Sequence, residues 1–191
     1  MRNIKCILIA AMLAVATPSY AQQLQPPREI FIRGEVTEQM VFDIDAQMRV
    51  LNSQGRREIT IHITSPGGGV YSGLQIYDII SESLSPTRTI CEGYCMSMAA
   101  VLLEAGTVRE SGASATIMFH GIATNAQGKL PEIAGEVAEA QRLEDLMNDL
   151  IANRSGLSRS AVEKMKDHDH FMSAKEAKSL DLIDVIRGSG K

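Results

Sequence analysis

Residues 58–84 read EITIHITSPGGGVYSGLQIYDIISESL, and this stretch is the most informative about the fold. Isoleucine occupies every second position from 59 to 63, which is the spacing of a β-strand with one buried face. The glycine run Gly67–Gly69 follows, and from Val70 onward the apolar residues recur at helical spacing. A strand, a glycine turn and a helix in direct succession predict a βα unit of an α/β fold.

The same alternation continues on both sides of this unit. We expect one α/β domain over residues 28–187, layered around a mainly parallel sheet. The predicted elements are a strand at 29–34, a helix at 36–51, a strand at 87–91, a helix at 98–105 closed by Gly106, a strand at 115–120, a long helix at 131–153 ended by Gly156, a short helix from Ser158, a capping box at 173–176 and a last strand at 182–186.

The N-terminus has the three parts of a secretory signal peptide. Arg2 and Lys5 precede an apolar run at 6–16, and the small residues Ser19 and Ala21 mark a cleavage site. The apolar run is shorter than the roughly 20 residues that span a bilayer. We therefore expect residues 1–21 to be removed and the protein to be exported, with a periplasm as the expected location and no further membrane attachment. An uncleaved N-terminal anchor is the alternative.

After cleavage about 170 residues would remain, enough for one domain with a hydrophobic core. We expect residues 22–27 to form a disordered lead-in and residues 188–191 a short tail. The net charge of the whole chain is −4, and it contains no block of basic residues, so no nucleic-acid partner is expected.

Three features of the pattern have both a structural and a functional interpretation. The glycine turn is either a plain tight turn or an oxyanion site, but it lacks the spacing of a nucleotide-binding motif. Ser97, between a strand and a helix, is either a helix N-cap or a nucleophile. His120 ends a strand and is either a rim histidine or a catalytic base. The run Asp167–His170 is interpreted as a solvated loop, with metal binding as the alternative; we predict no metal and no cofactor.

Several motifs together resemble the proteolytic subunit family of the caseinolytic (Clp) proteases. The matching segments occur in family order and cover nearly all of the chain after the predicted cleavage site. They are ITSPGGGVYSGLQIYD at 63–78, TICEG at 89–93, SMAA at 97–100, IMFH at 117–120 and DHFMSAKEA at 169–177.

This resemblance implies a Clp/crotonase-like layered fold and a serine endopeptidase. Ser97 would be the nucleophile, His120 the general base and Asp169 the carboxylate that orients it. The backbone N–H groups of Gly68 and Met98 would form the oxyanion hole. The long helix would correspond to the family's handle, which implies a homo-oligomer, with a ring as one arrangement.

Two departures from the family change the expected biology. The likeness starts at residue 28, so we expect the family's axial-loop segment to be absent. Export also removes the protein from cytoplasmic ATP. We therefore expect an ATP-independent peptidase that cleaves peptides or unfolded segments without an unfoldase. Cys91 and Cys95 both precede Ser97 in the chain and are a candidate redox pair. The sequence leaves open whether they form a disulfide.

Two other functions compete with the peptidase. One is a non-enzymatic scaffold that uses the fold for assembly or partner binding. The other is an acyl-CoA hydratase or isomerase of the crotonase type. The latter is disfavoured because coenzyme A is cytoplasmic and because all three triad positions are filled.

Overall fold

The structure is a computed structural model, and it describes residues 26–188. The predicted signal peptide, most of the predicted lead-in and the last three residues of the predicted tail lie outside the described residues. Within residues 26–188, no helix combines the length and the apolarity needed to cross a membrane.

The described residues alternate between strands and helices along most of the chain. The elements are β1 Glu29–Arg33, α1 Glu38–Ser53, β2 Ile59–Ser65, α2 Val70–Ser81, β3 Thr87–Met96, α3 Met98–Leu103, β4 Val108–Gly112, β5 Thr116–Phe119, α4 Leu130–Arg154, α5 Arg159–Met165, β6 His170–Ser173, α6 Ala174–Ser179 and β7 Val185–Arg187.

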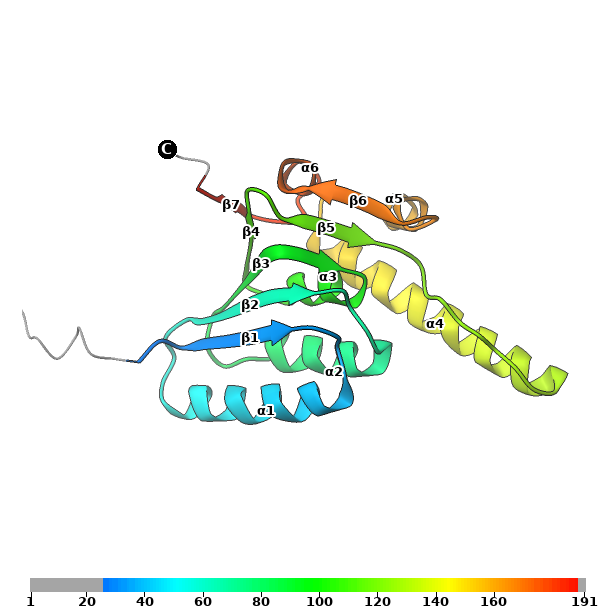
Figure 1. Cartoon of the computed structure of the whole chain (residues 1–191), viewed down its shortest axis with the longest axis horizontal. Helices are drawn as coiled ribbons and strands as arrows, with labels where there is room; N and C mark the ends of the chain where they lie inside the picture. The colour runs from blue at the N-terminus through cyan, green and yellow to red at the C-terminus, as the bar shows by residue number, and fades with distance from the viewer. Residues whose placement is uncertain (1–25, 189–191) are drawn as a thin grey trace, which may run out of the picture.

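The strands form one mixed sheet that is mainly parallel. Its main path runs β1-β2-β3-β4-β7, with every neighbouring pair parallel, while β5 lies parallel to the end of β3 and β6 pairs antiparallel with β5. The three helices α1, α2 and α3 lie along one side of this sheet, and α4 extends away from it (Figure 1). The predicted α/β fold with a mainly parallel sheet and a long helix is confirmed.

Strand β3 connects the two parts of the sheet, because it pairs with different strands along its length. Its first half pairs with β4 and its last three residues pair with β5. Between them the strand bulges: Ile63 of β2 faces Cys91, whereas Ser65 faces Cys95. Gly93 lies within this bulge at φ 81, a value that glycine adopts readily. The bulge lets a second layer of strands leave the main sheet beside the end of β3.

The prediction that the third strand stops at residue 91 is therefore wrong, since β3 continues to Met96. The sequence pattern also fails to predict strands β4 and β6. The inward-facing residues of β4 are Arg109 and Ser111, and β6 buries only Met172. Neither strand has the apolar alternation that identifies a strand in a sequence.

Several predicted element ends are also misplaced. Helix α3 ends at Leu103 with Glu104 as its C-cap, and α4 ends with Ser155 as its C-cap. The last strand is only Val185–Arg187. Gly106 serves packing instead of capping: a Cβ there would lie 2.3 Å from Thr89 Oγ1.

The apolar core lies between the sheet and helices α1 to α3. All five inward isoleucines of β1 and β2 are fully buried, and all six residues of α3 are buried. Helix α4 behaves differently along its length. Its buried residues all lie from Leu143 onward, while Leu130 and Val137 nearer its start are 82% and 51% exposed.

A buried network of charges fixes the end of the sheet opposite β1. Arg109 donates to Asp184 through Nε and Nη2, and its Nη1 donates to Glu104 Oε2 at 2.7 Å. Glu104 is fully buried, and its Oε1 has no hydrogen-bond partner within the described residues. Burial raises the pKa of Glu104 from 4.5 to about 8, against the opposing effect of Arg109.

This raised pKa predicts that stability falls as pH rises from about 5 to 8. In that window the folded protein keeps a proton on Glu104 that the unfolded chain has lost, so raising the pH favours unfolding by up to a few kcal/mol. We expect Glu104→Gln to remove this contribution, measured by urea unfolding at pH 5.5, 7 and 8.5. Glu58→Gln, at an exposed glutamate paired with Arg88, is the control. A stability difference between wild type and Glu104→Gln that is the same at all three pH values would contradict the assignment.

Candidate active site

Ser97 occupies a strained turn between β3 and α3. Its backbone is at φ 53 and ψ −126, and Asp181 is the other non-glycine residue among 26–188 with a positive φ. Such a conformation costs about 1–3 kcal/mol and persists only where neighbouring structure imposes it. Here the N–H of Ser97 donates to the carbonyl of Met118 in β5 at 2.8 Å, which ties the turn to the sheet.

The side chain of Ser97 does not act as a helix cap. Although Ser97 stands at the N-cap position of α3, its Oγ accepts no hydrogen bond from the helix. The capping interpretation of this serine is therefore not supported by its geometry. The hydroxyl is left free at the start of α3, where the N-terminal backbone donors of a helix gather.

The glycine turn lies against the Ser97 turn and is held to Val36 by two backbone hydrogen bonds. The N–H of Val36 donates to the carbonyl of Gly67 at 2.8 Å, and the N–H of Gly69 donates to the carbonyl of Val36 at 2.9 Å. Within residues 26–188, the N–H of Gly68 between them has no acceptor. The N–H of Met98 is the first of α3 and has no partner inside that helix. Two unused backbone donors therefore flank Ser97.

The structure adds a second reason for glycine at 68. The oxyanion-hole role implied by the resemblance predicts that a side chain there would obstruct an incoming carbonyl group. In addition, a Cβ on Gly68 would lie 2.4 Å from the carbonyl oxygen of Val36. Gly67 is equally constrained, although the sequence does not single it out: its Cβ would lie 2.8 Å from both Met96 O and Ser97 Cβ. Both positions exclude side chains through backbone packing.

His120 shares a pocket with Ser97. The cavity has a volume of about 140 Å³, and Gly68 of the glycine turn and Met98 at the start of α3 are among its lining residues. The rest of its wall is largely apolar. The remaining lining residues are Val70, Val101, Phe119, Gly121, Ile122, Ala123, Met147 and Lys166.

Asp169 reaches the same edge of the sheet through the pairing of β5 with β6. Phe119 faces His170 in the last pair of this antiparallel ladder, and His120 and Asp169 are the residues next to that pair in the chain. Asp169 is exposed. Among the described residues no hydrogen bond joins Ser97 to His120 or His120 to Asp169. Ser97 and His120 line one pocket, and Asp169 is not among its lining residues.

The run Asp167–His170 is predicted from the sequence to be a loop, but its last residue begins β6. The rings of His168 and His170 meet edge to face with centroids 5.9 Å apart. Across residues 26–188, no three His, Cys, Asp or Glu side chains converge in the manner of metal ligands.

Comparison with models of known protein families finds a match for this chain. The model of the family described as "Clp protease" matches residues 15–189. The chain belongs to the Clp protease family. The resemblance in its motifs is thereby confirmed, and membership of this family supports a Clp-type peptidase in general terms.

A disulfide joins Cys91 to Cys95 across the bulge of β3, a pairing that the sequence leaves open. The two Cα atoms are 5.8 Å apart, and both side chains are fully buried. The bridge spans Glu92–Tyr94, the looped-out part of the strand, and it ends two residues before Ser97. It therefore closes the base of the bulge that turns β3 toward β5.

Other residues of this Clp-type pocket could not be found from the sequence. Met147 comes from α4 and Lys166 from the end of α5, far along the chain from Ser97. A methionine in a helical apolar stripe and a lysine at a helix end are ordinary features of any globular protein. Only the packing of α4 and α5 beside the sheet reveals that they line the site.

We expect Gly67→Ala to damage the Ser97 turn. Its φ of 95 makes any side chain costly by about 1–2 kcal/mol, and the contacts at 2.8 Å add an overpacking cost of about 1–3 kcal/mol. Gly34→Ala is the matched control, because Gly34 has φ 79 but a Cβ there would meet nothing within 4 Å. Thermal unfolding followed by circular dichroism compares the two. A loss at Gly67 no larger than that at Gly34 would refute the packing argument.

Proposed function

We propose that this protein is an exported, ATP-independent serine endopeptidase that cleaves peptides or unfolded protein segments through Ser97, His120 and Asp169. The observation that carries the proposal is the Ser97 turn. A serine hydroxyl released from capping, in a pocket with a histidine and two unused backbone donors, fits acyl transfer better than a purely structural role.

Each residue has a distinct part in the proposed reaction. Ser97 Oγ attacks the substrate carbonyl carbon while His120 takes the hydroxyl proton. The resulting oxyanion accepts hydrogen bonds from the N–H groups of Gly68 and Met98. Loss of one such donor costs about 3–4 kcal/mol in other serine peptidases. His120 then gives its proton to the leaving amine, and water hydrolyses the acyl-enzyme by the same route in reverse.

Asp169 would orient His120 and stabilise its protonated form. This part of the proposal requires movement, because Asp169 is exposed and not yet bonded to His120. The two residues lie next to the last pair of the β5–β6 ladder, so their side chains would approach each other at this end of the two strands. The binding of substrate beside His120 would exclude water from this pair and strengthen it.

Export and independence from ATP rest on the N-terminal sequence. The charged start, the apolar run at 6–16 and the small residues before Gln22 are those of a secretory leader. A protein acting outside the cytoplasm has no ATP with which to drive an unfoldase. Substrates would then be short or already unfolded, and stimulation of the activity by an ATPase ring would contradict this part of the proposal.

The decisive test of the chemistry is covalent labelling of Ser97. Protein beginning at Gln22 is treated with a fluorophosphonate probe at neutral pH, with and without reductant, and the intact mass is measured. We expect one adduct on the wild type and a loss of labelling rate of about 10²-fold or more in Ser97→Ala and His120→Ala, because nucleophile and base act as a unit. A difference between the oxidised and reduced protein would show that the disulfide influences the turn.

Two substitutions serve as matched controls for this labelling. Ser114→Ala changes an exposed serine in the turn between β4 and β5, and His168→Ala changes an exposed histidine close in sequence to Asp169. Both should label like the wild type. If folded wild-type protein is not labelled in either redox state, the site is not assembled for catalysis. The non-enzymatic scaffold would then become the better account.

We also propose that the protein forms a homo-oligomer through α4. The N-terminal half of this helix projects from the body with Leu130 and Val137 exposed (Figure 1). Burying such side chains against a second copy would recover about 25 cal/mol per Å² of apolar surface. Size-exclusion chromatography with light scattering should show an assembly that Val137→Glu weakens. A monomer peak for the wild type at working concentration would refute it.

A further inference from the structure

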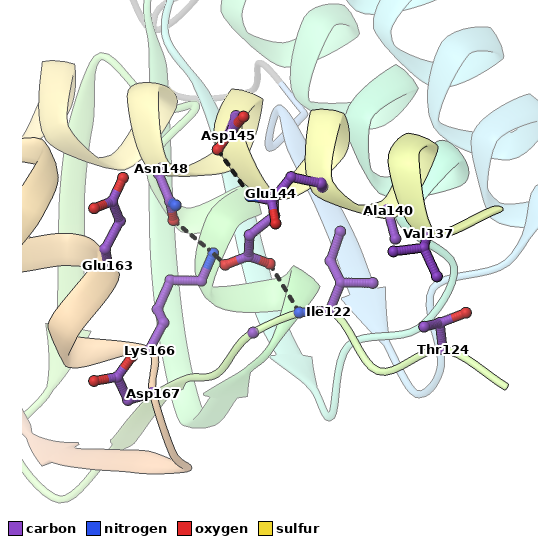
Figure 2. Close-up of a pocket in the computed structure, with 12 residues that line it drawn as sticks. Ile122, Thr124, Val137, Ala140, Glu144, Asp145, Asn148, Glu163, Lys166 and Asp167 are labelled. Carbon is purple, nitrogen blue, oxygen red and sulfur yellow. Dashed lines mark hydrogen bonds and ion pairs between the residues drawn. The ribbon is translucent and has the colours of Figure 1, made fainter. Parts of the chain in front are cut away.

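A second hollow adjoins the Ser97 pocket on the far side of the segment that follows His120. This groove, of about 380 Å³, lies between α4, α5 and the stretch from Gly121 to Thr124. It shares Gly121, Ile122 and Lys166 with the Ser97 pocket. Figure 2 shows the shared wall, with Lys166 directed toward the carboxylate of Glu144 and the amide of Asn148.

The wall is built on a buried ionic network. Lys166 is 5% exposed, and its Nζ lies 2.7 Å from Glu144 Oε1 and donates to Asn148 Oδ1 at 2.9 Å. The other carboxylate oxygen, Glu144 Oε2, accepts the N–H of Ile122 at 2.8 Å. The backbone carbonyl of Lys166 accepts the N–H of Gly121 at 3.1 Å. Of the two residues after His120, Ile122 is thus held by the side-chain network and Gly121 by the backbone of Lys166.

These bonds are the main restraint on the backbone that follows His120. Strand β5 ends at Phe119, and residues 120–127 form neither a strand nor a helix. Within that described stretch, Gly121 and Ile122 are the residues whose N–H groups have hydrogen-bond acceptors. The direction in which His120 leaves the sheet therefore depends on Glu144 and Lys166.

Stability alone does not account for such a network. A buried ion pair loses much hydration, and replacement by apolar residues of similar volume is often neutral or stabilising. Positioning accounts for it better, because Lys166 acts on both sides of the site. Its carbonyl holds the residue after His120, and Asp169 follows it by three residues, immediately before β6.

We propose that Lys166 and Glu144, with Asn148, are positioning residues that hold His120 in register with Ser97. This inference rests on the proposed serine-peptidase function of the pocket. Lys166 lines the Ser97 pocket, but among the described residues no hydrogen bond joins the network to Ser97, so it acts through the backbone of Gly121 and Ile122. Loss of the network should slow the chemistry while leaving peptide binding largely unchanged.

The first measurement compares Lys166→Met with the wild type. Lys164→Met is the matched control, since Lys164 lies on the same helix, exposed and two residues earlier. In Lys166→Met we expect fluorophosphonate labelling and kcat for a peptide to fall about 10²-fold, as displacements of about 1 Å do in active sites, with KM nearly unchanged. Without its ion pair to Lys166, the Glu144 carboxylate should hold Ile122 less firmly, so amide hydrogen exchange at Ile122 should accelerate. Lys164→Met should match the wild type in every readout.

A double variant separates positioning from simple stabilisation. Glu144→Leu combined with Lys166→Met replaces the buried pair by apolar groups and should restore the thermal stability that the single variant loses. It leaves the N–H of Ile122 without its acceptor, so labelling should stay slow and exchange at Ile122 fast. Recovery of the wild-type labelling rate together with stability would overturn the proposal, because the network would then be structural only.

The exchange measurement keeps this proposal distinct from the proposed function. If the wild type is not labelled at all, the peptidase proposal fails, yet exchange at Ile122 still reports whether the network holds the segment. If exchange there is the same in wild type and Lys166→Met, the positioning proposal is refuted whether or not the protein is a peptidase.

Discussion

A serine held at φ 53 carries a conformational cost of about 1–3 kcal/mol, and it stays there only because the chain is fixed on both sides of it. On one side, β3 is paired with β2 and β5; on the other, α3 is buried along its whole length. Gly67 fills the space against the turn at a distance that no side chain would allow. Most features of the site follow from this one constraint, since relaxing any of the three neighbours would let Ser97 return to an ordinary helix cap.

The bulge in β3 explains how one strand can serve both the core and the site. Before the bulge the strand lies between β2 and β4, inside the main sheet. After it, the strand pairs with β5 instead, and β5 is the strand that ends at Phe119, immediately before His120. The disulfide between Cys91 and Cys95 closes this offset covalently. The position of β5, and of His120 directly after it, relative to Ser97 is thus set by a local irregularity in the sheet. A regular β3 would not bring β5 close to the Ser97 turn.

The sequence predicts those parts of the fold in which burial follows a simple period. The alternating isoleucines of β2 and the apolar spacing of α1 are examples, and each corresponds to a buried face. The pattern fails at β4, whose inward residues Arg109 and Ser111 satisfy polar partners instead of an apolar core. For the same reason the start of β6 is predicted as part of a loop, and the sequence proposes a role for Asp169 only through the resemblance to the Clp family.

Lys166 marks the limit of predicting a site from local sequence. Its partners Glu144 and Asn148 lie on another helix, and the segment after His120 that they hold lies still earlier in the chain, so no local pattern connects them. Only the packing of α4 against α3 and α5 does so. The same part of α4 also supplies Met147 to the wall of the Ser97 pocket. Helix α4 therefore contributes to the site in two ways. Met147 forms part of the apolar wall of the pocket, and the carboxylate of Glu144 accepts a hydrogen bond from Ile122, close to His120. The position of α4 relative to the sheet must be fixed as closely as the Ser97 turn, because an error in either one separates the histidine from the serine.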